Sequence, residues 1–445
     1  GLVRGMKAGL EAEAHGIGEL ACTSVCKSLI YLFNAREGAA KIGRSHSAEL
    51  KGAKLVVVGA GVMGAGIASV ALKSGFKVVL VDRNDAAIAK AQKHIDGYFS
   101  ARGGIPSGMF STAGDIISAR DADIVIEAVY EDIAVKKQVL AQISEIVSKE
   151  CIIGTNTSSL PLSELQKAVS FPSRMLGVHF FNPAEKMPLV EVIRTQSASE
   201  LTVAKAAGLA GLFGKYPIIV EDVPGFLVNR VLSAYLCEAG WLIKEGYAPD
   251  SIDKIATDFG MPMGPCRLLD EIGLDVASKV AEIVAAGYGE RMKDPGITHK
   301  LAQRGVMGKK GGAGFYVYEG KKEIPNEAVG RALGISLNKE VDDSEVETIQ
   351  NRLILSMVNE SIRALDEGIA GEPGPGAAGQ IDLGSVMGFG FPAFYGGIIR
   401  YADSLGAVVL DEKLRHLEKT VGTRFIACEG IWRRAKRVRS FYEEM

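Results

Sequence analysis

The chain has 445 residues, of which 47% are hydrophobic and 23% are charged, as in folded globular proteins and unlike disordered ones. Its 51 Lys and Arg balance 53 Asp and Glu, so no global positive field favours binding to nucleic acid, and we expect no nucleic-acid partner. The length exceeds what one compact core usually serves and predicts two or three domains.

Six cysteines are scattered along the chain without a CxxC pair, which predicts no metal site. No apolar run approaches the roughly 20 residues that span a bilayer, so we expect no transmembrane segment. At the start of the chain, apolar residues recur at three- and four-residue spacing up to Ile42, which predicts one long helix. The polar stretch 41–47 is interpreted as a linker, and residues 1–48 are assigned to a linker helix.

From Lys54 the pattern changes to short apolar, β-branched runs that alternate at first with helical stretches. This alternation predicts a parallel, doubly wound α/β sheet of the Rossmann type over residues 49–223. The predicted strands are 55–58, 78–81, 124–126, 152–153, 178–181, 189–193 and 218–220.

After Gly225 the strand signals stop, apart from the short run 314–318, and the remaining sequence predicts an all-α domain. An internal duplication divides it into two homologous helical repeats, residues 224–320 and 321–445. The matching positions are Asn229-Arg230 with Asn351-Arg352, Glu238 with Glu360, Glu245-Gly246 with Glu367-Gly368, Asp253 with Asp382, and Gly260 and Pro262 with Gly390 and Pro392.

The motif GAGVMG, residues 59–64, follows the first predicted strand and opens a helix, as a dinucleotide-binding fingerprint requires. Gly59 permits the tight turn, Gly61 lets the backbone approach a pyrophosphate, and Gly64 lets the helix pack closely on the strand. Asp82 ends the next strand 18 residues past Gly64, where a carboxylate binds ribose hydroxyls and repels a 2′-phosphate. The pattern predicts NAD rather than NADP as cofactor.

His179 lies in an apolar strand, where a histidine is often an ordinary core residue. Glu191 follows on the next predicted strand after a short connection, so the two side chains can meet. A carboxylate on one ring nitrogen fixes the tautomer and raises the basicity of the other. The pair therefore favours a general base with its orienting carboxylate over a core histidine.

The motifs GAGVMG, VIEAVYED, NTSSL, HFFNP, LVEV, DVPGFLVNR and GMPMGP occur in this order between Lys51 and Tyr318. In these motifs the chain resembles the 3-hydroxyacyl-CoA dehydrogenase family. The resemblance implies NAD-dependent oxidation of an L-3-hydroxyacyl-CoA, an acyl-CoA substrate, to the 3-ketoacyl-CoA in fatty-acid β-oxidation.

The resemblance also implies roles for single residues. His179 would be the general base, Glu191 its orienting carboxylate, Ser158 a contact of the substrate hydroxyl and the nicotinamide, and Asn229 a ligand of the reacting oxygen. The alternatives are that Ser158 and Asn229 are helix caps and that Lys136 and Lys310 are solvated charges. The NAD site would comprise Gly59, Gly61, Val62, Met63, Gly64, Asp82, Ala128, Glu131, Lys136, Ser158, Asn182 and Lys310.

The opening helix and the second repeat resemble multifunctional β-oxidation enzymes, in which an enoyl-CoA hydratase module precedes the dehydrogenase. The chain therefore resembles the dehydrogenase part of such a protein, fused to or assembled with a hydratase module, and we expect no hydratase activity from it. The segment between Asp82 and Glu127 is shorter than is usual in the family, which places a CoA-binding helical hairpin there, so no CoA contacts are assigned.

Two other functions stay open: a 3-hydroxybutyryl-CoA dehydrogenase of a biosynthetic path, and a non-catalytic NAD-binding module. Since single-repeat members pair their helical domains across a twofold axis, the second repeat should replace a partner subunit. We therefore expect a monomeric dehydrogenase unit.

Overall fold

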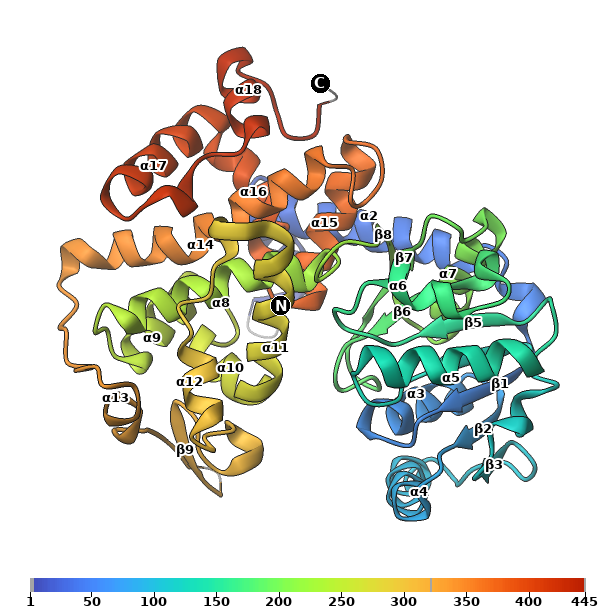
Figure 1. Ribbon diagram of the computed structural model, residues 1–445. Coiled ribbons are helices and arrows are strands. Elements are labelled where there is room, and N and C mark those ends of the chain that lie inside the picture. Colours follow the sequence, from blue (N-terminus) through green and yellow to red (C-terminus); the bar gives the residue numbers. More distant parts are fainter. Residues whose placement is uncertain (1–3, 321, 444–445) are drawn as a thin grey trace.

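The computed structural model describes residues 4–320 and 322–443, and Figure 1 shows its arrangement. A sheet flanked by helices forms one half of the molecule and a helical assembly forms the other. The predicted domain limits also include residues 1–3, 321 and 444–445, which lie outside the described residues.

Eight strands form the sheet, in the order β3-β2-β1-β4-β5-β6-β7-β8. Neighbouring strands from β3 to β6 run parallel, whereas β7 is antiparallel to β6 and parallel to β8. The strands are β1 (Lys54–Val58), β2 (Lys77–Val81), β3 (Phe110–Ala113), β4 (Ile124–Glu127), β5 (Ile152–Thr155), β6 (Met175–Phe180), β7 (Leu189–Arg194) and β8 (Tyr216–Glu221).

The predicted parallel, doubly wound arrangement is confirmed from β3 to β6, whereas β7 departs from it. The connection from β6 to β7, residues 181–188, is too short for the crossover that a parallel pair needs, so the chain turns back beside its own strand. Strand β3 was not predicted, because Ser111 and Thr112 at its centre are exposed and it lacks an apolar run.

Apolar residues cover both faces of the sheet. Helices α3, α4 and α7 pack on one face, and α5 and α6 lie on the other, whose core continues into the helical half. These helices are α3 (Val62–Lys73), α4 (Asp85–Ser100), α5 (Ile133–Ile146), α6 (Leu162–Leu165) and α7 (Glu200–Leu212). Between Asp82 and β4 the structure has the α-helix α4, strand β3 and a short 3-10 helix, Ile116–Ala119.

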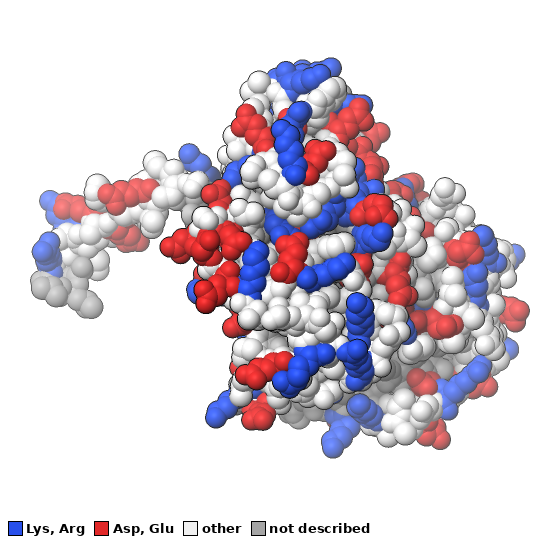
Figure 2. All heavy atoms as spheres, turned by 60° about the vertical axis from the view of Figure 1, so that its left-hand side comes forward, with Lys and Arg blue, Asp and Glu red and all other residues white. Residues whose placement is uncertain are grey.

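The prediction of one long opening helix is wrong. Two helices, α1 (Gly5–Ala21) and α2 (Ser24–Arg44), meet at a bend of 80°. Thr23 causes the break because its side chain accepts a hydrogen bond from the Cys26 amide at 3.1 Å and caps α2. No described residue of α1 is buried, and Figure 2 shows this helix as an arm beside the body.

Helix α2, in contrast, packs tightly on the body. A Cβ atom on Gly43 would lie only 2.9 Å from Cα of Gly211 in α7, so the stretch 41–47, which the sequence analysis interprets as a linker, is packed helix and turn. Among the described residues, no single helix is long and apolar enough to cross a membrane; α1 and α2 meet that criterion only when taken together across their bend.

The helical half contains two repeats, and among the described residues the first has six α-helices and a hairpin and the second has five α-helices. The first comprises α8 (Val228–Lys244), α9 (Pro249–Phe259), α10 (Pro265–Ile272), α11 (Leu274–Tyr288) and α12 (Ile297–Gln303), the hairpin β9 (Tyr316–Glu319) and β10 (Lys322–Pro325), and α13 (Ala328–Leu333). The second comprises α14 (Asp343–Asp366), α15 (Pro375–Gly388), α16 (Ile398–Leu405), α17 (Ala407–Thr420) and α18 (Glu429–Arg437).

Equivalent aspartates have equivalent partners in the two repeats. Asp253 accepts hydrogen bonds from the amides of Cys266 and Arg267 at the start of α10, and Asp382 accepts them from Ile399 and Arg400 at the start of α16. Burial raises the pKa of Asp253 to about 6 and that of Asp382 to about 7. The two aspartates thus do the same structural work in both copies.

The repeats exchange ion pairs across their interface. Arg230 of α8 pairs with Glu360 at 2.6 Å and with Glu367 at 2.7 Å. In the second repeat, Arg352 of α14 pairs with Glu238 at 2.6 Å and Glu245 at 2.6 Å. Glu238 and Glu245 of the first repeat correspond to Glu360 and Glu367 of the second, and each arginine binds the pair of the other repeat. The two repeats are therefore related by an approximate twofold axis.

Candidate active site

The candidate active site lies at the carboxyl ends of the parallel strands, where the chain order reverses between β1 and β4. Gly59 follows β1 with φ of +111°, and a Cβ atom there would come within 2.5 Å of the carbonyl oxygen of Ala128 after β4. A Cβ on Gly64 would lie 1.8 Å from the carbonyl oxygen of Gly59. Both positions therefore require glycine for packing, as the motif predicted.

The middle of the motif is open instead. No atom lies within 4 Å of a Cβ built on Gly61, and Val62 is 67% exposed at the first turn of α3, next to the half-buried Met63. Bare backbone at the N-terminus of a helix is a ready site for an anionic phosphate. The residues present thus fit the pyrophosphate of a dinucleotide.

Asp82 is held beside this loop. One of its carboxylate oxygens accepts the amide of Ala60 at 2.7 Å and the other accepts the amide of Asn84 at 2.9 Å. The side chain is half-buried, and each oxygen keeps a lone pair for a further donor. This is the position at which ribose hydroxyls are bound in dinucleotide-binding folds.

Polar residues after β4 and β5 form a connected network. Glu131 accepts hydrogen bonds from the Ser158 amide at 2.8 Å, from Ser158 Oγ at 3.0 Å and from Thr157 Oγ1 at 2.7 Å. Lys136 is completely buried and lies 3.4 Å from Glu131. The alternative that Lys136 is a solvated surface charge is therefore wrong.

His179 and Glu191 meet across β6 and β7. They are register partners, and His179 Nδ1 lies 2.7 Å from Glu191 Oε2. Since an ionised carboxylate can only accept, Nδ1 carries the proton in the neutral ring and Nε2 is left as the acceptor. The histidine is 5% exposed and its ring packs against Phe181 and Phe226, at centroid distances of 4.5 and 5.9 Å.

The carboxylate of Glu191 is itself fixed by the helical half. Its Oε1 accepts the amides of Leu227 and Val228 at 3.1 and 3.0 Å, at the first turn of α8. Glu191 is completely buried, so these amides and the imidazole replace the water it has lost. The orientation of His179 thus depends on both halves of the chain.

Asn229 and Ser158 also join the two halves. Asn229 Nδ2 donates to the carbonyl oxygen of Ser158 at 2.9 Å. Neither residue is a helix cap, because Ser158 Oγ binds Glu131 and α8 has no side-chain cap. The structure therefore brings Ser158 and Asn229 into contact.

Two predicted cofactor residues stand apart from this network. Asn182 is exposed on the loop after β6. Lys310 lies in the first helical repeat, is 49% exposed and forms an ion pair with Asp275. The structure does not bring Lys310 together with the other predicted residues.

The sequence reading missed three positioning residues. Glu127 is completely buried at the end of β4 and binds Lys136. Asn156 accepts the amide of Phe180 at 2.8 Å, and Lys215 donates to the carbonyl oxygens of Ala184 and Met187 at 2.6 and 2.7 Å, which holds the loop between β6 and β7. Glu127 and Asn156 each lie in a quoted motif, VIEAVYED and NTSSL, whereas Lys215 lies in none.

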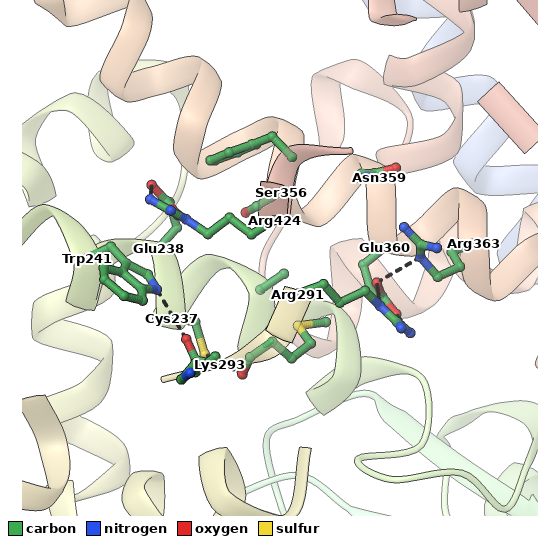
Figure 3. Close-up of a pocket in the computed structure, with 13 residues that line it drawn as sticks. Cys237, Glu238, Trp241, Arg291, Lys293, Ser356, Asn359, Glu360, Arg363 and Arg424 are labelled. Carbon is green, nitrogen blue, oxygen red and sulfur yellow. Dashed lines mark hydrogen bonds and ion pairs between the residues drawn. The ribbon is translucent and has the colours of Figure 1, made fainter. Parts of the chain in front are cut away.

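A small pocket that is partly open to solvent lies elsewhere, between α8 and α14 (Figure 3). Glu238 and Glu360 line it together with Arg291, Arg363 and Arg424. None of the predicted catalytic or cofactor residues lines this pocket. Within residues 4–320 and 322–443, no group of three His, Cys, Asp or Glu could hold a metal ion.

The glycine turn and Asp82 are the features of a dinucleotide-binding domain, and the His179–Glu191 pair lies in the same sheet. Comparison with protein families agrees: the model for the 3-hydroxyacyl-CoA dehydrogenase NAD-binding domain matches residues 54–223, and that for the C-terminal domain matches residues 225–318. The chain belongs to the 3-hydroxyacyl-CoA dehydrogenase family.

The relatives extend this relationship to the whole chain. The fatty acid oxidation complex subunit alpha of Vibrio vulnificus is 38% identical over 100% of this chain and 63% of its own length. The chain thus spans just under two thirds of that relative.

Two solved structures are also similar. The 3-hydroxybutyryl-CoA dehydrogenase of Escherichia coli has a TM-score of 0.74 and 26% identity, over 87% of this chain and 99% of its own. FadB2 of M. tuberculosis has a TM-score of 0.58 and 33% identity, over 60% of this chain and 100% of its own.

Proposed function

We propose that the chain oxidises the 3-hydroxyl of an L-3-hydroxyacyl-CoA to a ketone, as the dehydrogenase part of a longer fatty-acid oxidation protein. The observation that carries the proposal is the buried contact of 2.7 Å between His179 and Glu191, beside a dinucleotide fold. A scaffold that only binds NAD has no need of a buried base with an anchored carboxylate, which disfavours the non-catalytic alternative.

His179 acts as the general base. NAD, when bound, would supply the acceptor for the hydride lost from C3, and His179 Nε2 is the atom that accepts the hydroxyl proton. Glu191 stabilises the imidazolium that forms, because its negative charge lies against Nδ1. General-base catalysis of this kind contributes on the order of a hundred- to ten-thousand-fold.

Ser158 and Asn229 hold the reacting oxygen in this proposal. Ser158 Oγ contacts Glu131, and Asn229 donates to the Ser158 backbone, so both polar groups are fixed before a substrate binds. NAD is bound in this proposal by the glycine motif, Asp82, Ala128 and Glu131. The buried Lys136 holds this site by its contacts with Glu131 and the Val129 carbonyl oxygen. Asn182 remains a proposed cofactor residue on the strength of its HFFNP motif, and Lys310 on the family resemblance alone.

The second candidate is a 3-hydroxybutyryl-CoA dehydrogenase of a biosynthetic path, favoured by the similarity to the E. coli enzyme. The two functions differ in chain length and not in chemistry. Reduction of 3-ketoacyl-CoA by NADH should be measured spectrophotometrically from four to sixteen carbons. Similar kcat/KM along the series supports fatty-acid oxidation, a preference confined to four carbons supports the second candidate, and no reduction at any length contradicts both.

We further propose that this dehydrogenase unit is a monomer. The pairing of α8 with α14 through the crossed ion pairs supports this, because it buries within one chain the helical face that a partner subunit would cover. We also propose that a hydratase module is joined to this chain. The Vibrio relative is long enough to contain one, because this chain matches only 63% of its length.

A further inference from the structure

We propose that Glu127 is a positioning residue for the dehydrogenase reaction. It holds Lys136 and the loop after β4, so that Glu131 and Ser158 are presented to NAD and substrate. The inference deepens the proposed function and rests on it. Glu127 itself contacts none of the reacting groups.

Both carboxylate oxygens of Glu127 are held by buried protein donors. Its Oε1 accepts Lys136 Nζ at 2.8 Å and the Val129 amide at 2.7 Å, and its Oε2 accepts Thr155 Oγ1 at 2.6 Å. All three side chains, Glu127, Lys136 and Thr155, have no exposed surface. A carboxylate and an ammonium buried together need each other, since removing one leaves an uncompensated charge in the interior.

The loop between β4 and α5 is clamped by this pair. The Val129 amide donates to Glu127, and the Val129 carbonyl oxygen accepts Lys136 Nζ at 3.3 Å. The same loop carries Ala128, whose carbonyl oxygen crowds the position of Gly59. Glu127 thus sets the distance between the loop and the fingerprint turn.

Lys136 divides its charge between two carboxylates. It lies 2.8 Å from Glu127 and 3.4 Å from Glu131. Because Glu127 takes the closer position, Glu131 keeps its Oε1 for Ser158 and Thr157. If Glu127 loses its charge, Glu131 becomes the only carboxylate partner of Lys136 and is drawn away from Ser158.

The expected effect is specific to the site. Glu127→Gln should weaken NADH binding by about tenfold or more, because one buried charge-assisted hydrogen bond is lost, and should lower kcat with acetoacetyl-CoA. Asp123→Asn is the matched control. Asp123 lies just before β4, at its opposite end, and accepts the Lys54 amide at 2.8 Å, so its replacement should affect stability alone.

A second variant separates positioning from stability. Glu127→Gln/Lys136→Met removes both buried charges, so it should fold even where the single variant does not. If Glu127 acts through Lys136, the double variant should bind NADH within twofold of Lys136→Met. Glu127→Gln with wild-type NADH affinity, or a further loss of affinity in the Lys136→Met background, would overturn the proposal. Because NADH binding is read by fluorescence without substrate, this test stands even if the chain fails to reduce acetoacetyl-CoA.

Discussion

Replacing Arg230 by Met tests the crossed ion pairs that join the two repeats. Arg230 has no exposed surface, lies 2.6 Å from Glu360 and 2.7 Å from Glu367, and packs 4.5 Å from the centre of the Tyr288 ring. Met has a similar length and no charge. Its introduction leaves Glu360, which is 4% exposed, without its closest partner.

The structure sets the size of the loss. Breaking a buried ion pair costs about 3–5 kcal/mol, but Glu360 retains Arg291 at 3.1 Å and Arg363 at 3.3 Å. Glu367 is 44% exposed and regains water. We therefore expect the lower limit, about 3 kcal/mol, and a similar loss for Arg352→Met, because Glu238 retains Arg424 at 2.7 Å.

The assay is urea unfolding followed by tryptophan fluorescence. The only two tryptophans, Trp241 and Trp432, lie in α8 and α18, so the signal reports on the helical half. Lys254→Met is the control, since the Lys254–Asp258 pair is 73% and 61% exposed and should contribute little. If Arg230→Met and Arg352→Met both stay within about 0.5 kcal/mol of the wild type, the crossed pairs do not hold the repeats together.

Three further predictions follow from the sites already described. Asp82→Ala should narrow the ratio of kcat/KM with NAD to that with NADP, because a carboxylate that repels a 2′-phosphate is lost; an unchanged ratio argues against Asp82 as the ribose ligand. Since burial raises the pKa of Asp382 to about 7, its contribution to folding is greatest below its ordinary pKa of about 4 and is lost as the pH rises toward 7. The melting temperature of Asp382→Asn should therefore fall less than that of the wild type as the pH is raised from about 5 to about 8. An equal fall in the melting temperatures of the two proteins would contradict this. A variant that lacks residues 1–23 but keeps α2 should be a monomer at all concentrations in light scattering. If this variant is a dimer, the second repeat does not replace a partner subunit.

The sequence was sufficient for most of the sheet and for the centre of the site. Apolar β-branched runs predicted seven of the eight strands of the large sheet, and the fingerprint identified Gly59 and Gly64, at which the packing requires glycine, because these signals are local. Strand β3 escaped because it is an exposed edge with Ser and Thr at its centre. The bend at Thr23 was missed because the apolar spacing continues across it, although a threonine cap marks the break.

What the sequence could not give was the set of contacts between distant segments. The His179–Glu191 pair was within reach, because adjacent strands with a short connection bring their residues together. The hydrogen bonds from the amides of Leu227 and Val228 to Glu191 could not be predicted, because every residue except proline has a backbone amide and residue type does not show which amide will donate. Lys136 was predicted as a residue of the NAD site, and its burial against Glu127 was not predicted, because residue type alone does not show that a lysine is buried.

The most direct test of the central claim is the turnover of His179→Gln with acetoacetyl-CoA and NADH, measured with NADH affinity on the same preparation. The account predicts that kcat falls at least about a hundredfold while NADH binds nearly as in the wild type, because His179 is paired with Glu191 and not with the dinucleotide loop. Glu191→Gln should be less damaging, because it misorients the base without removing it. If His179→Gln keeps its turnover within about threefold of the wild type, His179 is a core histidine and the proposed mechanism is wrong.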